Sequence, residues 1–131
     1  MVDTNVVLDV IEKREPFFND SYGALCKALE AKDVLLVTAT AATDIFYLLC
    51  KHFHSTHKAK SCIERLSGLV VFADVLGSDI KTALVRNMSD FEDAVVDAVA
   101  KRNGADCILT RNAKDFAMSK VPAVLPTDFL K

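Results

Sequence analysis

Apolar residues along this chain fall into two patterns, short continuous runs and longer stripes of helical spacing. The continuous runs are typical of parallel strands that are buried on both faces. They predict strands at 34–37, 69–73, 107–110 and 123–125, preceded by a first strand that consists of the short run Met1-Val2. A first strand this short is unusual and leaves open whether a few residues are missing from the natural N-terminus.

Helical stripes fill the segments between these runs. They predict helices at 6–13, 19–32, 39–53, 56–66, 78–86 and 91–103. In the second of them the expected buried stripe is Tyr22, Leu25, Cys26 and Leu29. The clearest stripe is Phe91, Ala94, Val95, Ala98 and Val99.

Two residues mark helix ends in this pattern. Ser78 is a candidate N-cap for the helix at 78–86, and Gly104 stands at the left-handed C-cap position of the helix that begins at Phe91. Strands that alternate with helices at this spacing predict βαβ crossovers. We therefore expect an α/β fold in which helices cover both faces of a mostly parallel central sheet. With no linker or repeat, residues 1–131 form a single domain.

Composition narrows the class of protein. The chain is 51% hydrophobic and 26% charged, which excludes a disordered protein, and no stretch reaches the length of a membrane span. The N-terminus lacks the regions of a secretion signal. The four cysteines contain no C-x-x-C pair, so we interpret them as reduced, buried residues of a cytoplasmic protein. The net charge of −2 means that a nucleic acid would have to be bound through a local basic patch or through cations.

Polar side chains follow the predicted strands at the edge where ligands of open parallel sheets bind. Asp3 follows the first strand, Asp44 lies in the first turns of the next helix, and Asp93 opens the helix before the fourth strand. Asn112 and Asp115 follow that fourth strand. Carboxylates brought together at this edge would repel one another unless a cation neutralised them. Mg²⁺ prefers such oxygen ligands, and a bound divalent ion supports phosphodiester hydrolysis.

Each acid also has a purely structural interpretation. Asp3 could end its strand in an Asx-turn, and Asp44 could be a solvated helix residue. Asp90 and Asp93 have the spacing of an N-terminal capping box, an interpretation that is compatible with a ligand role for Asp93. Asp97, one turn further on, is either a supporting residue or an exposed one.

The basic and histidine residues near this edge are weaker indicators of function than the acids. Arg111 and Lys114 flank the predicted cleft, and Arg111 is the better candidate for a phosphate contact. We interpret His52, His54 and His57 as a solvated surface rather than a zinc site, because no cysteine or acid is arranged around them.

At these residues the sequence resembles the PIN-domain family. Four segments resemble the family motifs in order, namely Asp3-Thr-Asn-Val-Val-Leu-Asp, Thr43-Asp-Ile-Phe-Tyr-Leu-Leu, Asp93-Ala-Val-Val-Asp-Ala-Val-Ala and Leu109-Thr-Arg-Asn-Ala-Lys-Asp-Phe. The resemblance implies a three-layer PIN-like fold. It also implies that Asp3, Asp44 and Asp93 are catalytic metal ligands, with Asn112 and Asp115 as further ligands. Thr4, Asn5, Asp90, Asp97 and Thr110 would support this set.

The activity that the resemblance implies is that of a ribonuclease dependent on Mg²⁺ or Mn²⁺. Many small bacterial members resemble the toxins of toxin–antitoxin pairs, which form dimers and are held inactive by a small antitoxin. Two departures from the family pattern stand out. Asp44 stands where many members have Glu, and Asn112 stands where many have Asp, so Asp115 is a possible substitute.

Three other functions compete with a nuclease. A phosphotransfer hydrolase would carry a second Asp two residues after Asp3, where this chain has Asn5. A receiver-type signalling domain would have an acid before Asp3, where this chain has Val2, and a Lys after the last strand, where it has Pro126. A catalytically weak or inactive PIN-like module that binds RNA or a protein partner is the main alternative, because Asn112 departs from the family pattern.

Overall fold

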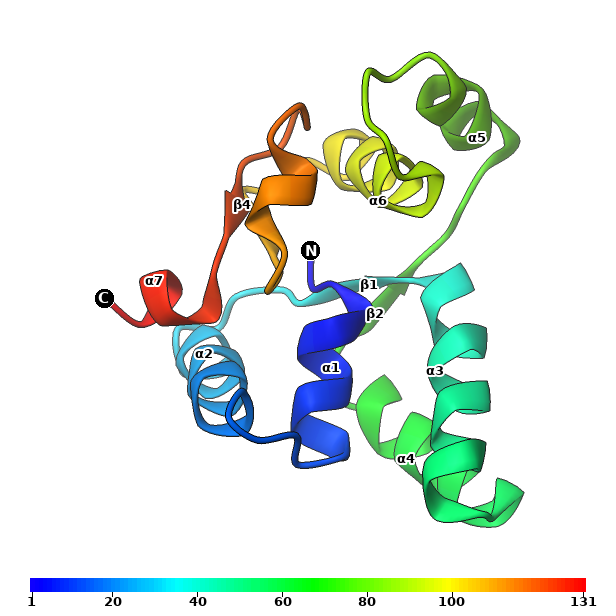
Figure 1. The fold of residues 1–131 in the computed structure, drawn as a ribbon, viewed down its shortest axis with the longest axis vertical. Coiled ribbons are helices and arrows are strands. Elements are labelled where there is room, and N and C mark those ends of the chain that lie inside the picture. The colour runs from blue at the N-terminus through cyan, green and yellow to red at the C-terminus, as the bar shows by residue number, and fades with distance from the viewer.

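The computed structural model describes all residues from 1 to 131, with seven α-helices arranged around short parallel strands (Figure 1). The helices are α1 (Thr4–Ile11), α2 (Phe18–Glu30), α3 (Ala39–Phe53), α4 (Thr56–Ser67), α5 (Gly77–Leu84), α6 (Phe91–Arg102) and α7 (Pro126–Leu130). The strands are β1 (Leu36–Thr38), β2 (Val71–Ala73), β3 (Ile108–Leu109) and β4 (Ala123–Val124), and a 3-10 helix η1 spans Ala113–Phe116. The predicted strands and helices occur in the predicted order, the strands are shorter than predicted, and α7 and η1 were not predicted.

The first residues of the chain join two strand pairs into one parallel sheet. β1 pairs with β2, and β3 pairs with β4, both in parallel. Val2 lies between the pairs: its amide donates to the Leu36 carbonyl at 2.7 Å, and it forms a parallel bridge with Leu109. Figure 1 shows the N-terminus at the centre of the molecule, next to β1. The expected first strand is therefore present, as a single bridging residue.

Alternate residues of the strands point to opposite faces, and each face has its own hydrophobic core. Val2, Val37 and Leu109 pack into a cluster of 14 buried residues that also includes side chains of α1, α2, α3 and α4. Met1 and Ile108 point the other way, into a cluster of 11 buried residues with α6. In Figure 1, α1 to α4 lie on one side of the strands, and α5 and α6 lie on the other. The expected α/β architecture, with helices on both faces of a parallel sheet, is confirmed.

The buried face of α2 differs from the predicted one. Tyr22 is 51% exposed, whereas Ser21, Ala24 and Ala28 are buried. Both sets have helical spacing, but small side chains let α2 approach α1 closely, and the Ser21 hydroxyl donates to the buried Asp9 at 2.9 Å. The hydrogen bond between Ser21 and Asp9 therefore determines which face of α2 is buried. Hydrophobicity alone favours the other face.

The ends of α5 and α6 also correct the predicted caps. α5 begins at Gly77, and its cap comes from Asp79, whose carboxylate accepts from the Leu76 amide at 2.8 Å, rather than from Ser78. Arg102 at the end of α6 donates to the same Asp79 carboxylate, so one buried acid caps α5 and ties it to α6. The predicted left-handed Gly104 is confirmed, with φ +65°. Phe91 is exposed and lies outside the core stripe that was predicted to include it.

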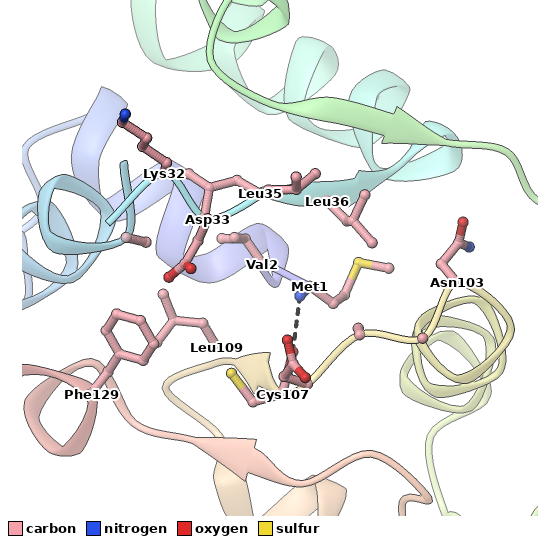
Figure 2. Close-up of a pocket in the computed structure, with 15 residues that line it drawn as sticks. Met1, Val2, Lys32, Asp33, Leu35, Leu36, Asn103, Cys107, Leu109 and Phe129 are labelled. Atoms are coloured by element: carbon pink, nitrogen blue, oxygen red, sulfur yellow. Dashed lines mark hydrogen bonds between the residues drawn. The ribbon is translucent and has the colours of Figure 1, made fainter. Parts of the chain in front are cut away.

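A large cavity of about 540 Å³ opens at the amino ends of the strands (Figure 2). The Met1 ammonium reaches into it and donates to the Cys107 carbonyl at 2.9 Å. All four cysteines are free, and they are half-buried rather than buried as predicted. No helix combines the length and the apolarity that crossing a membrane requires.

Candidate active site

Asp3 is fixed at the point where the bridging residue Val2 ends and α1 begins. It is the N-cap of α1: its Oδ1 accepts from the Thr4 amide at 2.8 Å. Its Oδ2 accepts from the Asn5 side-chain amide at 2.9 Å and from the Thr110 hydroxyl at 2.7 Å. Because each carboxylate oxygen has two acceptor positions, Oδ2 is saturated and Oδ1 keeps one free.

Thr110 connects Asp3 to the segment that follows β3. Its buried hydroxyl donates to Asp3 and accepts from the Asn112 amide at 3.0 Å. The Arg111 amide donates to the side-chain carbonyl of Asn5 at 3.3 Å. The structure thus brings Thr4, Asn5 and Thr110 together around the Asp3 carboxylate, where they hold it in place.

The pKa shifts of the acids identify which acidic side chains lie near Asp3. Burial raises the pKa of Asp93 to about 7, with further contributions from the negative charges of Asp90, Asp3, Asp115 and Glu92. Burial also raises the pKa of Asp3, although its hydrogen bonds and the charge of Arg111 act in the opposite direction. These acids come from distant parts of the chain, and the charges of Asp3 and Asp115 both act on Asp93, so the three lie near one another; a shared metal site at these residues stays a prediction.

Glu92 is a member of this cluster that the sequence did not single out. Burial raises its pKa first, followed by the charges of Asp44, Asp90 and Asp3. The pKa of Glu92 therefore responds both to Asp44, which is exposed on α3, and to Asp90 and Asp3 in the rest of the cluster. The sequence offered only a weak signal, because acids in the first turn of a helix are common for reasons of helix dipole and capping.

The donor set fits a hard divalent cation, although it does not form a compact cage. No three acidic, histidine or cysteine side chains stand close enough to enclose a metal ion together. Mg²⁺ is usually held by one or two carboxylates, with waters and substrate phosphates completing its octahedron. A free acceptor position on Asp3, near acids whose pKa values are raised by burial and by one another's charge, fits that mode of binding.

Asp90, the N-cap before α6, and Asp97, one turn after Asp93, have structural roles. Asp90 is the N-cap of α6 and accepts from the Asp93 amide at 3.0 Å, as its spacing predicted. Asp97 is completely buried, so the interpretation of Asp97 as an exposed residue is wrong. Its Oδ1 accepts from the amides of Lys120 and Val121 at 2.9 and 3.0 Å, and its Oδ2 lies 3.2 Å from Nε of Arg86.

The two candidate substrate-binding residues have different surroundings. Lys114 is exposed on η1, next to Asp115. The Nε of Arg111 lies 3.0 Å from the buried Oδ2 of Asp9, and its guanidinium stacks over Phe17 with 4.0 Å to the ring centroid. The Arg111 side chain is therefore held in one orientation. The three histidines lie at the junction of α3 and α4, with His54 as the left-handed C-cap of α3.

Replacing Asp93 by Asn is expected to stabilise the metal-free protein at about pH 8 and to change little at about pH 5. The pKa of Asp93 rises from 3.8 to about 7 on folding, so the folded state holds more protons between these values. The cost of the buried charge is fully present above pH 7 and is lost as the pH falls towards 4. Asn carries no charge, so its Tm gain of several degrees should appear only at the higher pH.

Thermal unfolding of both proteins with a chelator at the two pH values measures this effect. Asp106→Asn, at an exposed position, is the matched control and should leave Tm unchanged at both. An equal change of Tm for Asp93→Asn at both pH values would contradict a charge-based cost.

Comparison with known proteins identifies a family model and a relative that match this chain. The family model of the PIN domain matches residues 1–114. A curated relative, "Ribonuclease VapC1" of Aquifex aeolicus (strain VF5), is 26% identical over 133 aligned positions that cover 98% of this chain and 90% of the relative. No solved structure matches the chain.

Proposed function

The chain belongs to the PIN-domain family, and we propose that it is a metal-dependent ribonuclease that hydrolyses RNA phosphodiesters. The observation that carries this proposal is the cluster of acids around Asp3, in which burial and, after it, mutual charge raise the pKa of Asp93 to about 7. A site that concentrates negative charge in this way is suited to a cation and, through it, to a phosphate group. The name of the Aquifex relative, a ribonuclease, supports RNA as the substrate.

In this proposal Asp3, Asp44 and Asp93 are the catalytic ligands of Mg²⁺ or Mn²⁺. Asp3 would use the acceptor position that remains on its Oδ1. Asn112 or Asp115 would ligate or orient through water, and we add Glu92 as a residue that assists Asp44. A bound divalent cation supplies an acidified water and stabilises charge on the phosphate under attack.

The other residues of the site position the acids and the RNA. Asn5 and Thr110 fix the Asp3 carboxylate through hydrogen bonds of 2.9 and 2.7 Å, so that its orientation is set before the substrate arrives. Lys114 is exposed beside the cluster and can contact a substrate phosphate. Arg111 is the second candidate for such a contact, with both of its terminal nitrogens available.

The partners of this function are proposals as well. We propose that the chain acts as the toxin of a toxin–antitoxin pair, as a homodimer that a small antitoxin protein inhibits. Exposed apolar side chains support contacts with other proteins: Tyr47 projects from α3, and Leu84 and Val85 are exposed at the end of α5. Light scattering of the purified protein measures the dimer directly.

A non-catalytic binding module is the second candidate. Two observations favour it: no three ligand side chains enclose a metal ion together, and Asn112 stands where many family members have Asp. Such a module would bind RNA or a protein partner through the same cleft without cutting the RNA.

Cleavage of a mixed RNA panel in the presence of EDTA, Mg²⁺ or Mn²⁺ tests the proposal. We expect cleavage with either cation and none with EDTA, because the acids would repel the phosphate without a cation between them. RNA binding without cleavage under every condition would contradict the nuclease and support the binding module. Cleavage that persists in EDTA would contradict the metal dependence.

A further inference from the structure

A second cavity lies beside the acid cluster, on the other side of Arg111. It measures about 310 Å³, at the lower end of the range of about 300 to 1,000 Å³ that is usual for small-ligand sites. Its walls come from the segment before α2, the first turn of α2, Arg111, and the turn between β4 and α7. Arg111 connects the two sites, because its amide contacts Asn5, a neighbour of Asp3, while its side chain lines the cavity.

The Arg111 side chain forms a flat, fixed wall of this cavity. Its guanidinium stacks over the ring of Phe17 at 4.0 Å, and Phe17 remains 40% exposed. Asp9, which is completely buried, holds the guanidinium from behind at 3.0 Å and is itself bonded by Ser21. This Nε contact is close but is not aligned as a hydrogen bond, and neither terminal nitrogen of Arg111 donates to the protein.

The polar groups of the wall supply both hydrogen-bond donors and hydrogen-bond acceptors. Asp20 supplies a carboxylate acceptor, Thr127 supplies a hydroxyl, and Arg111 supplies unused donors. A flat ligand that carries acceptors on one edge and N–H donors on the next matches this set. Unpaired bases of RNA are such ligands, and they commonly stack on aromatic rings and on guanidinium planes.

We propose that this cavity is a subsite for an unpaired purine base of the RNA, and that guanine fits it best. Arg111 donates to O6 and N7 of guanine, which is the usual pairing of this side chain with that base. In this arrangement the terminal nitrogens of Arg111 bind the base, and the phosphate contact is left to Lys114. Asp20 accepts from the N–H groups of the base, and the exposed part of Phe17 supports stacking. The subsite rests on the proposed function for its substrate class, and it places a selected base next to the scissile phosphate.

Equilibrium binding to short labelled RNAs tests the subsite independently of cleavage. The protein carries Asp3→Asn so that the RNA stays intact, and the ligands are single-stranded uridine oligomers that contain one G, one A or no purine. We expect the G-containing RNA to bind about tenfold more tightly than the A-containing one, within the range for a good base contact. Phe17→Ala should weaken its binding about tenfold, as for the loss of one stacked base.

Two further variants separate the subsite from general effects. Asp20→Asn, at a partly exposed position, should reduce the preference for G over A several-fold, with the part read by Arg111 retained, while the fold stays intact. Tyr22→Ala removes an exposed aromatic ring of α2 outside the cavity, and it should bind all three RNAs as the parent does. Circular dichroism and Tm check that each variant is folded.

The outcomes distinguish this subsite from the proposed activity. If Phe17→Ala and Asp20→Asn bind every RNA as Tyr22→Ala does, the subsite is wrong, whether or not the wild type cleaves RNA. If base preference depends on Phe17 and Asp20 while the wild type cuts nothing, the nuclease proposal fails and the subsite stands. Competition by free guanosine monophosphate, without any G preference among the RNAs, would overturn the RNA base in favour of a mononucleotide.

Discussion

The Asp3→Asn variant is expected to lose RNA cleavage by roughly 10²- to 10³-fold or more and to remain folded. Asn lacks the charge that attracts a cation, and its amide nitrogen would occupy one of the two oxygen positions. The fold should persist because the Asn oxygen still accepts from the Thr4 amide as an N-cap. The Asn5 amide and the Thr110 hydroxyl would both lose the Oδ2 acceptor, so the cost is about 1 to 3 kcal/mol.

Cleavage rates with Mg²⁺ and thermal unfolding of the same preparations measure the two parts of this expectation. Asp106→Asn is the matched control: the residue is exposed at the amino end of β3, and the variant should cleave RNA as the wild type does. Full activity of Asp3→Asn would remove the basis for a metal-dependent site around this residue.

The Asp97→Ala variant is expected to lower the free energy of unfolding by about 3 to 5 kcal/mol, the usual cost of breaking a buried ion pair. The change leaves the amides of Lys120 and Val121 without an acceptor and leaves Arg86 without its counter-charge. A domain of this size is stabilised by only about 5 to 15 kcal/mol, so the loss should lower Tm by roughly 10 °C or more.

Urea unfolding of wild type, Asp97→Ala, Arg86→Ala and the double variant isolates this interaction. The double variant should lose less than the sum of the single losses, because the single changes each leave a charge unpaired. Asp33→Ala, at an exposed loop position, serves as the control and should unfold with the wild type. A stable Asp97→Ala protein that has lost only activity would contradict the structural role and favour a direct role in the site.

The order of elements could be predicted from the sequence because each element has a distinctive pattern. α3 begins and ends where its stripe predicted, and α6 ends one residue before its prediction. The face of α2 could not be predicted, because Ser21 is buried only as the partner of Asp9, which lies 12 residues away. The strands were predicted too long, because backbone pairing covers only part of each apolar run; β1 and β2 each begin two residues later than predicted.

The candidate site was predictable as far as the acids follow the strands. Asp3 and Asp115 come together because parallel strands deliver their carboxyl ends to one edge, and Asp93 joins them from the first turn of α6. The involvement of Glu92 and the partnership of Arg111 with Asp9 were not predictable. Both depend on how α1 and α6 are rotated about their axes, and that rotation is set by contacts between distant segments.

The position of Val2 between the two strand pairs determines when, during synthesis of the chain, the site around Asp3 can assemble. Asp44 belongs to the part of the chain made early in synthesis, while Asp93, Thr110 and Asp115 are made late. Asp3 is the first of them to be made, but its hydroxyl partner is Thr110, and the Val2 bridge needs Leu109. A nascent chain therefore has no assembled acid cluster, and we expect the proposed nuclease to stay inactive until its last third has been translated and folded.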